Sequence, residues 1–189
     1  TDASVIGQVA RHPNAQDPLF TPDQHWQHGD FLQTDEFTLR AIHTPGHASN
    51  HLCFLLEEEE LLFTGDHIME GSTVVIMPPD GDMLAYINAL HDLKKLQLRH
   101  LAPAHGHLVN QPLQLIEGLI QHRLMRENKA LDKMRQLGPC TLDTLTPSVY
   151  DEVPSFLHGL ARMSLLAHLL KLEQEQRISQ QDGIWRICD

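Results

Sequence analysis

Three short polar clusters in this 189-residue chain are built from side chains that bind transition metals. Their sequences are His43-Thr-Pro-Gly-His47, Thr64-Gly-Asp66 and Pro103-Ala-His105-Gly106. Each contains a glycine, which favours a sharp turn at the end of a strand. Imidazole and carboxylate groups held at strand ends are a common ligand composition for zinc and related metals. The clusters are therefore candidates for a metal site.

Histidine is abundant in this chain, which has fourteen of them, so a histidine near a loop can arise by chance. Any one cluster taken alone is more consistent with a structural or exposed position than with a ligand. Three clusters in order, each beside a turn, are harder to explain in that way. The residues leave two interpretations open: a metal-dependent hydrolase, or a histidine-rich surface without a metal.

Short apolar segments precede the clusters and predict the strands that position them. Segments 30–33 and 37–42 predict one hairpin, and segments 52–56 and 61–63 predict a second across the acidic turn 57–60. Leucines at helical spacing predict a helix over 83–98, with Asp82 as its N-cap. Strands on both sides of this helix predict an α/β layer arrangement.

At the three clusters the sequence resembles the metallo-β-lactamase superfamily, because both the order and the approximate spacing of the motifs agree. The resemblance implies that His47, Asp66 and His105 are metal ligands, with Asp66 shared between two ions, commonly zinc. The segment 71–83 is similar to the subgroup that contains the β-lactamase-like protein 2 hydrolases. The implied fold is the second half of an αββα sandwich.

The same resemblance implies a hydrolase that acts on a small-molecule substrate. A hydroxide between the two metals would attack an ester, thioester, amide or phosphodiester centre. His43 and His51 are candidates for residues that hydrogen-bond and orient the metal ligands without binding the metal. The alternative is a structural role, with His43 at the strand end and His51 packed under the loop. His158 is a candidate for substrate contact, and His107 is expected to be exposed.

One family motif, His-x-His-x-Asp-His, does not occur in this sequence. In the family it lies upstream of the position of Thr1 and supplies four further ligands. We therefore expect this chain to be the C-terminal part of a longer enzyme, with the N-terminal half as its partner. Two protein ligands per metal, one of them shared, predict weak or absent zinc and no activity in this chain alone.

The C-terminal part has the order of elements of a winged helix. A long helix over 112–137 has Pro112 near its start and is ended by Gly138 and Pro139. It is followed by a helix over 141–145 with Thr141 as its cap, by a helix over 160–176, and by a hairpin of 177–179 with 184–187. The sequence of this C-terminal part also resembles the winged-helix module of the same hydrolase subgroup. We therefore predict a hydrolase part over 1–111 and an all-α, winged-helix-like domain with a small hairpin over 112–189.

The net charge of −11 is uneven along the chain. Residues 1–111 contain five Lys/Arg against fifteen Asp/Glu, and residues 112–189 contain nine against ten. An acidic front half disfavours attraction to phosphate backbones, and the third helix of the module is rich in leucine, so we expect no specific DNA binding. Two other functions remain open: a catalytically inactive binding or assembly domain, and a metal-dependent nuclease.

The three cysteines, Cys53, Cys140 and Cys188, are scattered and form no disulfide or metal pattern, which favours a reducing cytoplasm. The apolar runs are too short to span a membrane. We also expect a sheet face or edge that the missing half leaves uncovered, and an exposed apolar face favours instability or association, for example into a homo-oligomer.

Overall fold

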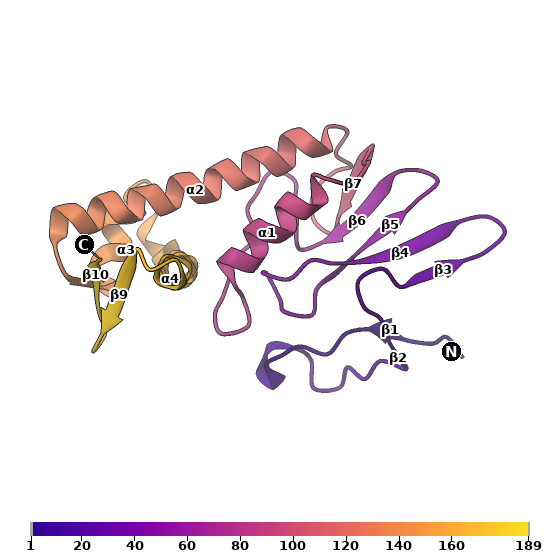
Figure 1. The fold of residues 1–189 in the computed structure, drawn as a ribbon, viewed down its shortest axis with the longest axis horizontal. Coiled ribbons are helices and arrows are strands. Elements are labelled where there is room, and N and C mark those ends of the chain that lie inside the picture. The colour runs from indigo at the N-terminus through magenta and orange to yellow at the C-terminus, as the bar shows by residue number, and fades with distance from the viewer. Residues whose placement is uncertain (1, 189) are drawn as a thin grey trace.

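The computed structural model describes residues 2–188 and has two parts that share one long helix (Figure 1). A five-stranded sheet with two helices above it forms the N-terminal part. Helices with a three-stranded sheet form the C-terminal part. The expected α/β layer followed by a winged-helix module with a hairpin is confirmed.

The main sheet has the order β3-β4-β5-β6-β7. Its strands are β3 (Phe31–Gln33), β4 (Thr38–His43), β5 (Leu52–Leu56), β6 (Leu61–Gly65) and β7 (His100–Pro103). The first three pairings are antiparallel, which confirms both predicted hairpins, and β7 joins β6 in parallel. β4, β6 and β7 therefore run in the same direction.

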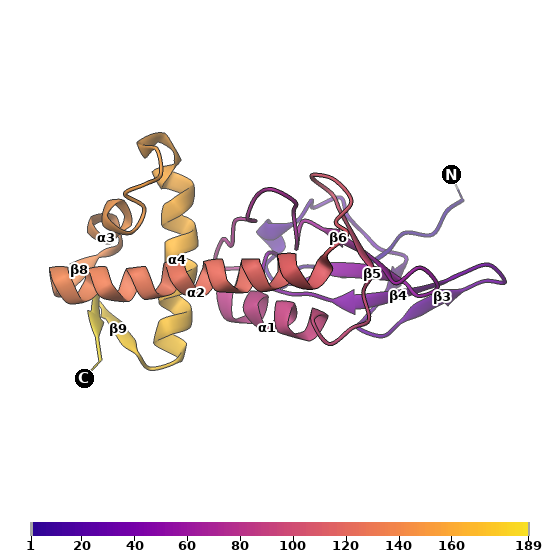
Figure 2. The same ribbon diagram turned by 90° about the horizontal axis from the view of Figure 1, so that it is seen from above.

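One face of this sheet is covered by α1 (Met83–Leu93) and by the first half of α2 (Pro112–Leu137), as Figure 2 shows from above. Strand residues such as Leu62 and Leu101 point into this layer and are fully buried. They pack with Leu90 of α1 and Ile116 of α2 in one hydrophobic cluster. This packing fixes the strand ends from which the polar clusters emerge.

The first helix is shorter than predicted, because it ends at Leu93 and not at residue 98. Asp82 caps its start as expected, accepting a hydrogen bond from the Ala85 amide at 2.9 Å. Beyond Leu93 the chain tightens, and the Leu96 amide bonds the Leu93 carbonyl three residues back. The polypeptide must turn here to pair β7 with β6, so tertiary pairing overrides the helical spacing of Leu96 and Leu98.

Helix α2 begins at Pro112 and ends before Gly138, as predicted, and contributes to two separate cores. Ile116 and Ile120 belong to the cluster under the main sheet, whereas Leu131 and Met134 belong to the cluster of the C-terminal part. Because this one helix stabilises both parts, the boundary between residues 111 and 112 stays a prediction.

Two charged residues of α2 face the interior of the protein. Arg123 and Glu127 are buried, at 4% and 2% exposure. The Arg123 side chain donates a hydrogen bond to the Val74 carbonyl. Glu127 accepts a hydrogen bond of 2.8 Å from Lys171, which lies in the C-terminal part. The alternation of charges along α2 does not distinguish an inward-facing charged position from a solvated one.

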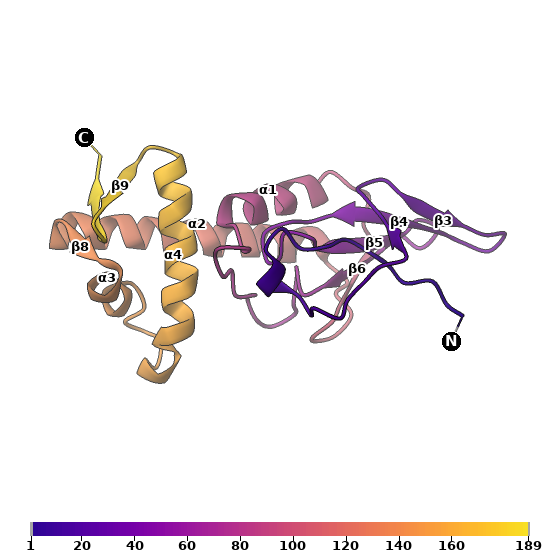
Figure 3. The same cartoon turned by 90° about the horizontal axis from the view of Figure 1, so that it is seen from below.

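The C-terminal part contains α3 (Leu142–Val149), a 3-10 turn (Ser155–Leu157) and α4 (His158–Gln174). Thr141 caps α3 as predicted, but the helix continues to Val149 with Pro147 inside it. α4 begins and ends two residues earlier than predicted. It crosses α2 at a steep angle in the view of Figure 3.

A small antiparallel sheet of order β8-β10-β9 completes the module. β9 (Ile178–Gln181) and β10 (Ile184–Ile187) form the predicted hairpin, and β8 (Cys140–Thr141) pairs with β10. Trp185 of β10 is 5% exposed and belongs to the hydrophobic cluster of the module.

The other face of the main sheet is only partly covered. The N-terminal segment, with the short parallel strands β1 (Ile6–Gly7) and β2 (Gln24–His25), lies on this side, and Trp26 packs its ring 6.3 Å from that of Phe54. Phe63, paired with Phe54, remains 43% exposed. The expected association through this face stays a prediction.

Cys53, Cys140 and Cys188 are free thiols in the described chain, and burial raises the pKa of Cys53 to about 12. Cys53 is therefore an inert core residue. Among residues 2–188, no helix is long and apolar enough to cross a membrane.

Candidate metal-hydrolase site

The three polar clusters follow β4, β6 and β7, which run in the same direction through the main sheet. Their carboxyl ends therefore meet at one edge, where loops commonly carry functional groups. The loops are also joined directly: the Ala104 amide donates to the Gly65 carbonyl at 3.0 Å. The topology thus places the loops of His47, Asp66 and His105 at one end of the sheet.

Asp66 and His105 are in direct contact at this edge. Asp66 Oδ1 lies 3.4 Å from His105 Nε2, and the His105 side chain is 72% exposed. The contact does not meet hydrogen-bond geometry, and Asp66 Oδ1 is shielded from solvent with no hydrogen-bond donor among the described residues. A buried carboxylate oxygen normally has a partner, so this Asp66 oxygen is an unsatisfied acceptor, although the side chain as a whole is 45% exposed.

His47 is oriented by a backbone carbonyl. Its Nδ1 lies 2.9 Å from the Val75 carbonyl oxygen, so Nδ1 carries the proton and donates. In the neutral ring, Nε2 is then the nitrogen with the free lone pair that can bind a metal. Histidine ligands in metalloproteins are commonly held by this kind of contact from the second ring nitrogen.

His43 and His51 make contacts inside the first loop. His43 Nε2 lies 2.9 Å from the Ser49 carbonyl oxygen and donates to it, so this histidine closes the loop. His51 Nδ1 lies 2.8 Å from Thr44 Oγ1. Burial, and then the neighbouring His47, lower the pKa of His51 to about 4, so His51 is neutral at pH 7. Both residues support the loop from within.

His67 is a residue that the sequence did not single out, although it follows Asp66 directly. It is fully buried, and neither ring nitrogen has a hydrogen-bond partner in the part of the chain that the structure describes. Its ring lies 5.6 Å from that of His51 and 4.8 Å from that of Tyr86. Burial lowers its pKa well below the usual value. His67 thus makes tilted ring contacts with both His51 and Tyr86 directly after Asp66 in the chain.

His107 and His158 are not part of this constellation. His107 is exposed, as predicted. His158 lies at the start of α4, and its Nε2 donates to the Val153 carbonyl at 3.0 Å. Its role as a substrate contact stays a prediction.

The residues at this edge fit part of a metal site. A metal site is supported by the types of donor atom, by the orientation of His47 and by the unsatisfied oxygen of Asp66. However, residues 2–188 contain no group of three or more ligands close enough together to hold an ion. A catalytic zinc typically has about three protein ligands. The described residues therefore do not build a complete site.

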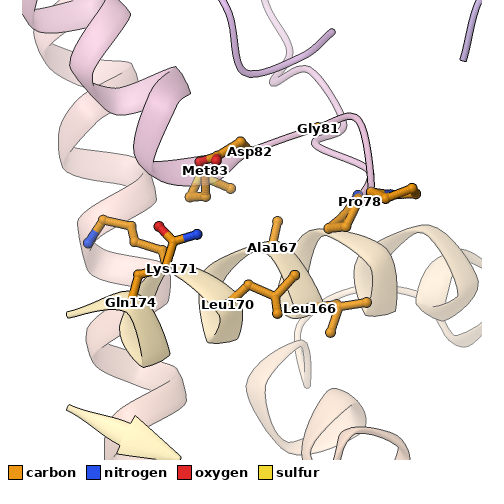
Figure 4. Close-up of a pocket in the computed structure, with 10 residues that line it drawn as sticks. Pro78, Gly81, Asp82, Met83, Leu166, Ala167, Leu170, Lys171 and Gln174 are labelled. Atoms are coloured by element: carbon orange, nitrogen blue, oxygen red, sulfur yellow. The ribbon is translucent and has the colours of Figure 1, made fainter. Parts of the chain in front are cut away.

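Two cavities of similar size lie beside the helices. One, of about 450 Å³, lies between the turn 78–82 and α4, and Leu166, Ala167 and Leu170 of α4 are among its lining residues (Figure 4). The other, of about 540 Å³, lies between the segment 70–73 and the first half of α2. Only the second has a lining residue, Glu70, that bonds the His105 loop.

Sequence profiles of two families match this chain. Residues 6–105 match the metallo-beta-lactamase superfamily, and residues 141–185 match the beta-lactamase associated winged helix domain. The first match alone covers more than half of the chain, and both agree with the parts described above.

Curated relatives at about one third identity include fungal proteins. Lactamase-like protein nscB of Arthroderma benhamiae is 33% identical over 187 residues, covering 91% of this chain and 40% of that protein. An Aspergillus chevalieri protein named atrochrysone carboxyl ACP thioesterase is 34% identical over 161 residues, covering 80% of this chain and 50% of that protein. The chain spans about half the length of the curated relatives it matches.

Two solved structures with a similar fold come from bacteria. A metallo-beta-lactamase family protein of Thermus thermophilus is 24% identical, with a TM-score of 0.77 over 89% of this chain and 55% of that one. A beta-lactamase domain protein of Burkholderia ambifaria gives 0.78 at 19% identity, over 90% of this chain and 54% of that one. With the profile match over residues 6–105, these findings show that the chain belongs to the metallo-β-lactamase superfamily.

Proposed function

We propose that this chain is part of a metal-dependent hydrolase that cleaves an ester or thioester bond at the edge formed by β4, β6 and β7. The observation that carries the proposal is the pairing of Asp66 and His105. The two side chains come from the ends of different strands, and His105 Nε2 lies 3.4 Å from Asp66 Oδ1. Asp66 Oδ1 has no hydrogen-bond donor within residues 2–188. The similarity to a protein named as a thioesterase supports the thioester class.

The proposed roles follow from the contacts of each side chain. Asp66 Oδ1 and His105 Nε2 offer two donor atoms, and His47 offers Nε2 because its Nδ1 is engaged by Val75. His51 and His43 hold the His47 loop in shape. Zinc ions, when bound, supply a hydroxide nucleophile near neutral pH by lowering the pKa of water.

We further propose that tight metal binding needs ligands in addition to these three. Two donors per ion, with Asp66 shared, leave a site without the chelation of a complete ligand set. The curated relatives are about twice as long as this chain, so an additional segment is a natural source of the remaining ligands. An N-terminal half of the same protein is the proposed partner.

The test compares Asp66→Asn and His105→Ala with His107→Ala, an exposed histidine two residues away. Each variant is made in this chain and in a longer natural form that carries a His-x-His-x-Asp-His motif. Zinc is measured by elemental analysis after dialysis, and hydrolysis with ester and thioester substrates. We expect about two zinc ions and activity in the longer form, lost in the first two variants and kept in the third.

Two results would contradict the proposal. Equal hydrolysis by the Asp66→Asn variant and the unchanged protein would remove the assigned role of Asp66. Absence of hydrolysis in the longer form with its zinc bound would favour an inactive binding or assembly domain. An RNA substrate assayed beside the esters tests the nuclease alternative.

A further inference from the structure

The cleft between the segment 70–73 and α2 has an apolar floor and a polar rim that carries one carboxylate, Glu70. Val109, Leu115 and Leu119 form the floor. Side chains with hydroxyl, amide or imidazole groups form the rim: Ser72, Thr73, Gln111, Gln114 and His122. With a volume of about 540 Å³, it has the size and composition of a small-molecule site.

Gly118 gives this cleft part of its depth. It lies inside α2, where glycine is among the least favourable helix residues. Apart from its chain neighbours and the backbone of α2 itself, a Cβ at this position would have none of the described atoms within 4 Å, so packing against other elements does not require glycine here. Gly118 is exposed, and its missing side chain leaves space beside the cleft that is open both to water and to a bound ligand.

The charges around the cleft select the chemical class of the ligand. Among the described residues that line it, none is Lys or Arg, and Glu70 is an acid. Burial, together with the neighbouring Arg123 and Arg126, lowers the pKa of His122, so its ring is neutral at pH 7. Arg123 and Arg126 themselves donate to the backbone carbonyls of Val74 and Val149. A phosphate group would find no lining cation, whereas an apolar group with hydroxyl or carbonyl substituents suits both floor and rim.

The cleft shares a wall with the loop of His105. The Glu70 amide donates to the His105 carbonyl at 3.2 Å, and a Cβ on Gly106 would lie 2.6 Å from Glu70 Cβ. Resting on the proposed hydrolase function, we infer that this cleft binds the acyl group of the substrate, a neutral and mainly apolar group large enough to use the space at Gly118. The segment 70–73 and α2 then determine which acyl groups are accepted.

Gly118→Leu fills the cleft and tests the inference, with Gly118→Ala as a milder change. Leucine and alanine both have higher helix propensity than glycine, so we expect the melting midpoint of each variant to be unchanged or raised. Gly159→Leu is the matched control, because Gly159 also lies in a helix, has open space around it and is not a lining residue.

Binding is measured first, in this chain and independently of hydrolysis. The probe is an amide analogue of the 2-naphthoyl thioester of N-acetylcysteamine, in which nitrogen replaces the thioester sulfur. The fluorescence of its naphthalene ring reports binding. 2-Naphthyl phosphate serves as an anionic probe of the same ring size. We expect the amide to bind more tightly than the phosphate, and Gly118→Leu to weaken amide binding about tenfold or more. Gly159→Leu should leave it within about twofold.

Hydrolysis is then measured in the longer zinc-bound form with 2-naphthoyl and acetyl thioesters. Gly118→Leu should lower kcat/KM about tenfold or more for the naphthoyl substrate, mainly by raising KM, and leave the acetyl substrate nearly unchanged. If binding depends on Gly118 but no thioester is cleaved, the hydrolase proposal fails, and the cleft is left as a binding site for a neutral, mainly apolar group. If thioesters are cleaved but neither binding nor acyl preference depends on Gly118, or if the phosphate binds better, the cleft assignment is wrong.

Discussion

Several imidazoles of this protein are held neutral inside the fold. His67 and His168 are fully buried, and burial lowers the pKa of both. For His168 the nearby carboxylate of Glu127, 3.9 Å away, opposes this effect but does not reverse it. An unfolded chain exposes these rings to water, where they take up protons near pH 6.5.

His168 therefore makes stability depend on pH. Its pKa is lower in the folded state, so the unfolded state binds more protons as the pH falls below about 6.5. Its contribution to the free energy of unfolding is fully present above that pH and is lost on acidification. Chemical denaturation of the protein and of His168→Gln at several values between pH 7.5 and pH 5 measures this. The variant should lose less stability; parallel curves would contradict the assignment.

Gly65 ends β6 with φ of +51°, a left-handed conformation that side chains rarely adopt. A Cβ there would lie 2.8 Å from His51 Nε2. We expect Gly65→Ala to cost about 1–3 kcal/mol in the free energy of unfolding, from backbone strain and this clash. The same change in a His51→Ala background removes the clash and should cost less. An equal cost in both backgrounds would leave backbone strain as the whole effect.

Helices α2 and α4 are joined by charges as well as by apolar side chains. Lys171 of α4 contacts Glu127 of α2 at 2.8 Å and Glu175 at 2.7 Å, and the Lys171 and Glu127 side chains are 6% and 3% exposed. Arg177 reaches Glu127 at 3.0 Å from the chain after α4. A buried pair of this kind specifies how the two helices pack, because either charge alone would be left in a poorly solvated place.

Removing one partner of this pair should therefore be worse than removing both. Glu127→Leu leaves Lys171 buried with only Glu175 and should cost about 3–5 kcal/mol, whereas Glu127→Leu with Lys171→Met should cost less. A double-mutant cycle by urea denaturation gives the coupling energy. Additive losses would show that the two charges do not depend on one another.

The hairpin at the C-terminus is held by Trp185, which is 5% exposed in the module core. Trp185→Ala should lower the free energy of unfolding by about 3–5 kcal/mol, because it removes a large buried ring. Arg186→Ala, at the exposed neighbouring position, is the control and should change it by less than about 0.5 kcal/mol. An unchanged melting midpoint in the Trp185 variant would contradict its place in the core.

The whole molecule places a winged-helix module next to a hydrolase-like sheet, with α2 passing through both cores (Figure 1). In such modules the third helix can enter the major groove of DNA. Here α4 directs His168 and Lys171 into the protein, where both are buried, and Lys171 is neutralised by two carboxylates. These side chains are therefore not free to contact bases.

We accordingly expect no sequence-specific binding to duplex DNA. The net charge of −11 opposes approach to the phosphate backbone as well. A polarisation titration at physiological salt, with one labelled duplex and scrambled competitors, measures this. Tight binding that discriminates between the duplexes would overturn the prediction.

The sequence determined the elements whose signals are local. Alternating apolar strands, the caps at Asp82 and Thr141, and the proline and glycine that bound α2 all act through neighbouring residues, so these elements were predicted closely. The ordered polar clusters likewise placed His47, Asp66 and His105 after strands. Local signals also misjudged the end of α1, since pairing between β6 and β7 competes with helix formation there.

Only the tertiary structure decided which polar groups meet and which are buried. The contact of Asp66 with His105, the buried ring of His67 and the inward charges of Arg123 and Glu127 all depend on residues distant in sequence. The cleft beside Gly118 likewise exists only because the segment 70–73 lies against α2. Burial and contact arise only when elements pack together. Local patterns of residue types therefore do not show which polar position is buried or which residues meet.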